Sequence, residues 1–303
     1  MRNGLVTVTN EEYLDGTKVL FYSFLAHNPQ FEGDLIVIHH DLSAEKQQEL
    51  ILLFDVIFVR IGEELIHAIE ALVQEKRELI NRYQRFWSLA VFKLNQYENL
   101  LFLDSDILIR GSLQHLFETS NGFSSCPDLS FYEGVSRSRV SFQKVESHLN
   151  PDENILKTFN AGVFSVCFSK LSPTVYVELL DLVKGSVFSG VKSGHTDQYV
   201  LNIYFENKVN WLDLTNNYVL KKTELIERVG GVSASEALVW HYIRHPKPWK
   251  LMRATKNKLK GIPISTYWSE WHSTYRLVLK ESNGKCFKIK NLLSVWLSKI
   301  LMP

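Results

Sequence analysis

Strand-like and helix-like segments alternate along the first hundred residues of the chain. Short runs rich in valine, isoleucine and leucine are typical of buried strands, and they occupy residues 4–10, 34–40, 55–61 and 99–104. Segments of helical length separate these runs: 11–26, a run that Ser43 can cap, and most of 62–94. This alternation favours an α/β fold in which helices cover both faces of a largely parallel sheet.

The rest of the chain continues the pattern less regularly. Strands are predicted at 159–168 and 237–242, helices at 172–183 and 195–206, and a polar surface excursion at 129–156. From about residue 250 the chain is basic and aromatic and no longer alternates. We therefore expect a main domain over residues 1–250 and a C-terminal extension over 251–303.

Composition excludes several classes of protein. Of 303 residues 45% are hydrophobic, and the net charge of +1 gives no field that would recruit nucleic acid, so no nucleic-acid partner is expected. The three cysteines, Cys126, Cys167 and Cys286, are far apart and odd in number, which favours a reducing compartment. The amino terminus lacks the apolar core of a signal peptide, and the apolar stretch 291–303 is too short to span a bilayer and contains Lys299. We expect a cytoplasmic protein, or one peripheral on the inner face of the cytoplasmic membrane.

Two aspartates lie at the end of the predicted strand 99–104: one is its last residue and the other follows two residues later. Asp104 and Asp106 are two residues apart and so share a face, at the strand end where open α/β sheets bind ligands. Adjacent carboxylates repel each other, and a hard divalent cation with a diphosphate is their natural complement. Taken alone, the triplet is explained equally well by two solvated aspartates. Aspartate-nucleophile phosphatases carry a similar triplet, but near the domain start and followed by threonine, whereas Ile107 and Leu108 follow here.

Four further motifs accompany this pair in order along the chain. They are TNEEY (9–13), FNAGVF (159–164), HTDQYVLN (195–202) and WHYIRHPKPW (240–249). Over roughly residues 5–250 the set resembles the glycogenin-like glycosyltransferases, family 8 of the retaining enzymes, and is most similar to the bacterial lipopolysaccharide galactosyl- and glucosyltransferases. The resemblance implies a Rossmann-like GT-A catalytic domain with a mostly parallel sheet, followed by a helical and basic C-terminal extension. It also implies a UDP-sugar donor, manganese, and transfer with retention of anomeric configuration.

By this resemblance Asp104, Asp106 and His241 hold the metal, and Asp104 also contacts the ribose. Without it, a histidine at a strand end is more often a hydrogen-bonded core residue. A mixed nitrogen and oxygen ligand set suits Mn²⁺ better than Mg²⁺, which remains the alternative.

The resemblance also assigns residues to the donor. The family's uridine-binding segment corresponds to Thr9, Asn10 and Tyr13, although a helix cap with a core tyrosine would explain these residues as well. The positions beside the donor sugar correspond to Asn160, Ala161 and Gly162, which otherwise form an ordinary buried strand.

The reacting groups implied by the resemblance are Asp197, Gln198 and Lys247. Asp197 and Gln198 correspond to the family's pair near the anomeric carbon, although acidic residues also favour helix amino termini for their dipole. Lys247 corresponds to the lysine that neutralises the β-phosphate, where charge grows in the transition state.

Two basic positions leave alternatives open. Arg244 stands where the family has glycine, so its guanidinium either contacts phosphate or weakens donor binding. A basic residue on the helix before the aspartates should reach the donor, and Arg85 fits this role, with Lys93 as second choice.

We therefore expect a retaining hexosyltransferase that moves galactose or glucose from UDP-galactose or UDP-glucose to a glycan or glycolipid acceptor, as in lipopolysaccharide biosynthesis. Front-side attack is favoured, since the amide of Gln198 is a poor nucleophile. The alternatives are a non-catalytic nucleotide-sugar-binding module, which only Arg244 favours, and a glycogenin-like self-glucosylating primer, for which no tyrosine stands out. A sugar nucleotidyltransferase would need a glycine-rich loop that residues 7–16 do not supply.

The acceptor and any membrane contact are the least determined features. Four lysines mixed with Phe287 and Trp296 in the segment 285–303 suit an anionic membrane surface, or a terminal helix packed on the domain. The aromatic segment 266–275 is either core or an acceptor platform, and 129–156 either shapes the acceptor pocket or is a plain loop.

Overall fold

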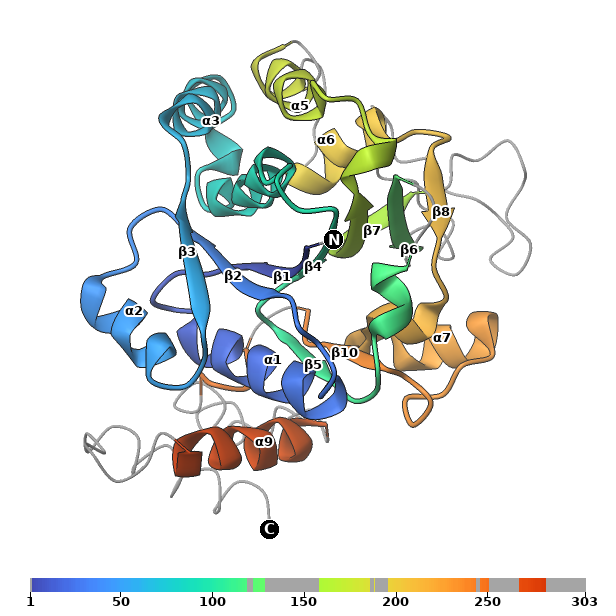
Figure 1. The fold of residues 1–303 in the computed structure, drawn as a ribbon. Helices are drawn as coiled ribbons and strands as arrows, with labels where there is room; N and C mark the ends of the chain where they lie inside the picture. Colours follow the sequence, from blue (N-terminus) through green and yellow to red (C-terminus); the bar gives the residue numbers. More distant parts are fainter. Residues whose placement is uncertain are drawn as a thin grey trace.

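The structure is a computed structural model that describes most of the chain (Figure 1). The described residues are 2–118, 122–128, 158–185, 188, 196–243, 246–250 and 267–281. Three features singled out in the sequence lie outside them: the excursion at 129–156, Arg244, and the basic tail at 285–303.

Seven strands form the central sheet. They are β1 (Asn3–Val8), β2 (Asp34–His39), β3 (Val56–Arg60), β4 (Asn99–Leu103), β6 (Phe123–Pro127), β7 (Phe159–Cys167) and β8 (Val209–Trp211). Their order across the sheet is β3-β2-β1-β4-β7-β6-β8 (Figure 1). The first four are mutually parallel, and β6 and β8 are parallel to each other, whereas β7 runs antiparallel to both β4 and β6. The expected, mostly parallel sheet is confirmed, with one reversed strand.

A small second sheet continues from the end of β4. It contains β5 (Ile107–Ile109), β9 (Tyr218–Val219) and β10 (Val239–His241), in the order β5-β10-β9. Because β10 pairs antiparallel with β5, His241 lies opposite Ile107, the residue that follows the aspartate pair. The small sheet thus brings a distant histidine to the end of the central strand.

Helices cover both faces of the central sheet (Figure 1). The α-helices are α1 (Leu14–His27), α2 (Ala44–Ile51), α3 (Glu63–Glu75), α5 (Val175–Lys184), α6 (Asp197–Tyr204), α7 (Thr223–Gly230) and α9 (Trp268–Glu281). Short 3₁₀ helices occupy Arg77–Leu79, Tyr83–Lys93, Gln114–Phe117, Phe168–Lys170, Leu214–Asn217 and Leu220–Lys222. Ser43 lies at the amino-terminal cap of α2, as predicted. Among the residues that the structure describes, no helix combines the length and the apolar character that crossing a bilayer requires.

The prediction that 62–94 is mostly helix holds for α-helix only as far as Glu75. The chain there continues as 3₁₀ turns, chiefly over Tyr83–Lys93. All residues from Phe86 to Phe92 are buried, so this segment packs on several sides at once. A segment that is buried on several sides does not need the single apolar face of an amphipathic α-helix. Packing against the surrounding elements therefore decides its local conformation.

Alternate residues along a strand point to opposite faces of the sheet and belong to separate hydrophobic clusters. Val6 belongs to the cluster beneath α3, α5 and α6, whereas its neighbour Leu5 belongs to the cluster beneath α1 and α2. This two-sided burial explains the nearly continuous apolar runs of the strands.

A third cluster joins the small sheet to α9. Trp268, Trp271 and Tyr275 of α9 are all buried in it, and Trp249 packs against the same group. Of the two interpretations of segment 266–275, burial therefore supports the core. The loop that carries Lys247 packs against α9 through Trp249, whose ring centre lies 5.7 Å from that of Trp271.

His272 makes the fold sensitive to acid. It lies on α9 with 3% exposure, and a ring N–H donates to the carbonyl of Pro248. Burial lowers the pKa of His272 to about 4, so the unfolded chain, with its ordinary pKa of about 6.5, binds the proton more readily. Stability from this residue is present above pH 6.5 and is lost as pH falls toward 4. Urea unfolding at pH 7 and 5 should show wild type losing about 2 kcal/mol more than His272→Phe. Equal losses in both proteins would contradict this assignment.

Candidate active site

One cavity of about 370 Å³ opens at the carboxyl ends of β1 and β4. Its lining includes Thr9, Asn10, Tyr13, Gln84, Arg85, Ser88, Asp104, Asp106, Asn160, Ala161, Gly162, Asp197, Gln198, His241 and Lys247. Every site residue predicted from the sequence is among them, except Arg244, which lies outside the described residues. Strand ends of this kind are where open α/β sheets bind ligands.

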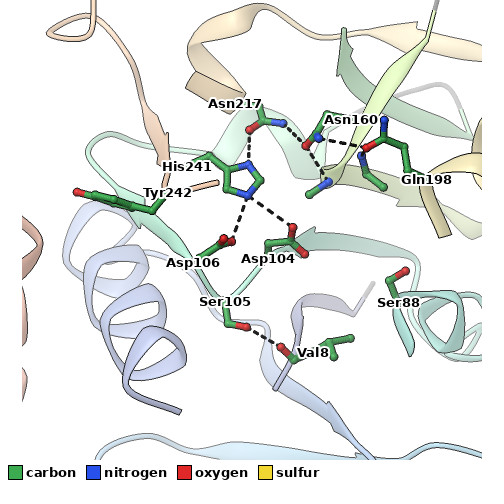
Figure 2. A network of polar contacts seen from close by, with 12 residues as sticks. Val8, Ser88, Asp104, Ser105, Asp106, Asn160, Gln198, Asn217, His241 and Tyr242 are labelled. Carbon is green, nitrogen blue, oxygen red and sulfur yellow. Dashed lines mark hydrogen bonds and ion pairs between the residues drawn. The ribbon is translucent and has the colours of Figure 1, made fainter. Parts of the chain in front are cut away.

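Three of these side chains converge as a candidate metal site (Figure 2). His241 Nε2 lies 3.1 Å from Asp106 Oδ1 and 3.5 Å from Asp104 Oδ2, and the ligand atoms of all three lie within 4.8 Å of one another. Gly162 makes room for them, because a Cβ there would lie 2.4 Å from His241 and 2.7 Å from Asp104. Two carboxylates and one imidazole fit Mn²⁺ by ligand chemistry, and they leave positions for substrate oxygens.

A cluster of charges surrounds Asp106. The Lys247 ammonium donates to Asp106 Oδ2 and, at 2.8 Å, to the carbonyl of Tyr242. Burial alone would raise the pKa of Asp106, but Lys247 and His241 hold it well below its usual range. Burial alone would lower the pKa of His241, yet Asp106 and Asp104 raise it to about 9. The Asp104 and Asp106 carboxylates thus attract positive charge, and Lys247 and His241 lie beside them.

The end of β1 forms one wall of the cavity. Asn10 accepts the backbone N–H of Tyr13 at 3.0 Å and donates to Gln84 at 2.8 Å. Thr9 is buried, and its hydroxyl accepts a bond from Thr17 at 2.7 Å. The Tyr13 ring meets Trp249 edge-on at 5.3 Å. Asn10 and Tyr13 therefore face the cavity with fixed orientations, whereas the Thr9 hydroxyl is held within the fold.

The opposite wall is formed by β7 and the first turn of α6. Gln198 Oε1 accepts a bond from Asn160 Nδ2 at 3.2 Å. Asp197 is buried and accepts bonds from Ser88 and Thr196, each at 2.8 Å. Burial and the nearby Asp104 carboxylate raise the pKa of Asp197 to about 6. These polar groups surround a space beside the candidate metal site.

The two candidates for a donor-contacting basic residue lie in different surroundings. Arg85 lines the cavity, whereas Lys93 pairs with Glu64 at 2.5 Å on an exposed surface. The structure therefore favours Arg85 over Lys93.

The sequence did not single out several polar groups of this site, including Ser88 and Thr196, which bond to Asp197, and three amide or carboxylate side chains. Asn217 bonds to His241 at 2.8 Å, Asp128 to Gln198 at 2.8 Å, and Gln84 to Asn10. None of the three belongs to a motif that carries the family resemblance. The short polar run 215–217, between Leu214 and Tyr218, does not single out Asn217 from its neighbours.

Known proteins resemble this chain in sequence and in fold. The family model described as Glycosyl transferase family 8 matches residues 5–252. GlyF, a glycosyltransferase of Streptococcus pneumoniae, is 26% identical over 89% of this chain and 63% of its own length. Lipopolysaccharide 1,3-galactosyltransferase of Salmonella typhimurium is 25% identical over 79% of this chain and 71% of its own length. The chain thus spans less than two thirds of GlyF.

A solved structure of the galactosyltransferase LgtC, in complex with donor and acceptor sugar analogues, superimposes with a TM-score of 0.68. It covers 96% of this chain and 99% of LgtC at 16% identity, which confirms the expected GT-A fold. The family match extends over most of the chain and includes all five motifs. The chain therefore belongs to glycosyl transferase family 8.

Proposed function

We propose that this protein is a retaining, metal-dependent hexosyltransferase that uses UDP-galactose or UDP-glucose. The observation that carries the proposal is the convergence of Asp104, Asp106 and His241 beside Lys247 in one cavity. Family membership supplies the reaction class.

The order of groups along the cavity matches the parts of a nucleotide sugar. Tyr13 offers a ring for the base, and the Lys247 ammonium lies 5.7 Å from the centre of that ring, where a diphosphate would follow. Asp106 and His241 come next, and Gly162 adjoins His241 and Asp104. Beyond lie the polar groups of β7 and α6, suited to the hydroxyls of a hexose.

Asp104, Asp106 and His241 would hold Mn²⁺, or Mg²⁺ as the alternative. Bound there, the ion would supply a Lewis acid for the charge on the departing diphosphate. Lys247, which pairs with Asp106 in the structure, would contact the β-phosphate and stabilise the same charge. Arg85, on the adjacent wall, adds positive charge on the donor side.

Asp197 and Gln198 orient the sugar in this proposal. The two carboxylate oxygens of Asp197 already accept bonds from Ser88 and Thr196, and the amide of Gln198 is a weak nucleophile. We therefore favour front-side attack, in which a diphosphate oxygen accepts the acceptor's proton. Mass spectrometry that detects a sugar covalently attached to Asp197 would contradict this.

For the acceptor we propose a hydroxyl of a glycolipid or polysaccharide precursor at the cytoplasmic face of a membrane. The relative named lipopolysaccharide 1,3-galactosyltransferase and the basic tail at 285–303 support this. Liposome flotation tests the tail: truncation after Gly284 should abolish binding to anionic vesicles, and unchanged binding would contradict a role as an anchor.

UDP release from a panel of UDP-sugars tests the donor and the metal together. We expect one donor, UDP-galactose or UDP-glucose, to be hydrolysed slowly with Mn²⁺ and not after EDTA treatment, because water replaces the missing acceptor. Tight UDP binding without release from any donor would instead support the non-catalytic nucleotide-sugar-binding module. Release that EDTA does not affect would contradict the metal assignment.

A further inference from the structure

A row of four hydrogen bonds leads from the candidate metal site across the cavity wall. Figure 2 shows it from His241 as far as Gln198. His241 Nδ1 bonds to Asn217 Oδ1 at 2.8 Å, and Asn217 Nδ2 donates to Asn160 Oδ1 at 2.9 Å. Asn160 Nδ2 donates to Gln198 Oε1 at 3.2 Å, and Gln198 Nε2 donates to Asp128 Oδ2 at 2.8 Å. The row connects the imidazole with the amide that faces the sugar space.

The direction of the row follows from one backbone group. The N–H of Gly162 can only donate, and it bonds to Asn160 Oδ1 at 3.0 Å, so that atom must be the amide oxygen. The atom of Asn217 facing the same oxygen must then be its NH₂ group, which turns the Asn217 oxygen toward His241. An amide oxygen only accepts, and Nδ1 of His241 must therefore carry a hydrogen.

The same logic extends to the other end. With Asn160 Oδ1 assigned as the oxygen, its NH₂ group faces Gln198, and the NH₂ group of Gln198 faces the carboxylate of Asp128, an obligatory acceptor. The Gly162 N–H and the Asp128 carboxylate therefore require the same direction, in which each side chain of the row donates to the next one on the way from His241 to Asp128. Asn217 is 2% exposed, so water does not compete for its bonds.

We propose that Asn217 is a positioning residue that couples the metal site to the sugar site. By accepting from Nδ1 it keeps Nε2 of His241 turned toward Asp104 and Asp106 as the ligating nitrogen. By donating to Asn160 it orients the Asn160 amide, which in turn donates to Gln198 and fixes the orientation of the Gln198 amide. This proposal rests on the proposed function, but it adds a residue and a linkage of its own.

Two substitutions separate the two bonds of Asn217. Asn217→Leu removes both, and should weaken Mn²⁺ binding in the presence of UDP by about 10- to 100-fold. Asn217→Asp keeps an acceptor for His241 but cannot donate to Asn160. It should leave Mn²⁺ affinity within about threefold of wild type while UDP release falls by about 10- to 100-fold, because Gln198 loses its orientation.

Electron paramagnetic resonance of free Mn²⁺ gives the affinity, and UDP release gives turnover. Asn216→Leu is the matched control: Asn216 is also buried, but bonds to His115 and to the backbone of Asp213, and both readouts should stay near wild type. Wild-type Mn²⁺ affinity in Asn217→Leu, or equally weakened affinity in Asn217→Asp, would overturn the proposal. Absent Mn²⁺ binding in the wild type would instead overturn the proposed function.

Discussion

Replacing Asp106 with asparagine is expected to lower Mn²⁺-dependent UDP release by about three orders of magnitude, the effect of losing several kcal/mol of charge stabilisation. Asparagine keeps the shape of the side chain and removes only its charge. Asp106 is 6% exposed and is the acceptor shared by Lys247 and His241. Without its charge, the site loses one of the two carboxylates proposed to hold the ion, and the Lys247 ammonium loses its counter-charge, so a divalent cation is attracted much less strongly.

Asp34→Asn provides the matched control for this substitution. Asp34 begins β2, so it lies at the end of the strands that is opposite the cavity. There it accepts bonds from Arg2 at 2.5 Å and Tyr97 at 2.6 Å. Its replacement removes one carboxylate from an ion pair without touching the cavity, so UDP release should remain near wild type. A folded Asp106→Asn protein with undiminished metal-dependent release would show that Asp106 does not hold the ion.

Lys247→Met should reduce turnover at saturating donor by about 10²- to 10³-fold, as expected when one group that stabilises developing charge is removed. Methionine preserves much of the apolar stem that passes through the buried loop. The ammonium lies between the Tyr13 ring and Asp106, the region we assign to the diphosphate. Because its interaction strengthens as the leaving group gains charge, kcat should fall more than KM rises.

Lys250→Met tests whether this loss is specific. Lys250 belongs to the same loop but is partly exposed and pairs with Glu12 at 3.3 Å. A surface pair of this kind contributes little, so turnover should change less than twofold, or about 0.4 kcal/mol. Similar losses in both variants would indicate that the substitutions disturb the loop rather than a phosphate contact.

The alternation of strands and helices made the fold largely predictable. Apolar runs buried on both faces of a sheet differ clearly from helical segments, and side chains two apart on a strand must share a face. The nearness of Asp104 and Asp106 could be inferred from their spacing, although the two lie in the connection between β4 and β5 rather than on one face of a strand. His241 could not, because it reaches Asp106 across 135 residues through the register of β5 and β10. Only the family resemblance connected them.

The remaining misses share a physical cause. Residues 83–93 are buried on several sides, and their 3₁₀ conformation is set by packing that periodicity does not report. The short strands β8 and β9 contain three and two residues, too few for an alternating pattern. Asn217 acts through hydrogen bonds to partners far along the chain, and nothing in its local sequence distinguishes it from Asn216.

The central claim is that Asp104, Asp106 and His241 bind one divalent cation next to the donor diphosphate. Anomalous diffraction at the manganese edge, from crystals grown with Mn²⁺ and UDP, measures this directly. We predict a single strong peak within bonding distance of Asp106 and of Nε2 of His241, and also in contact with the diphosphate. A peak bound only by the diphosphate, with His241 still bonded to Asp106, would contradict the account.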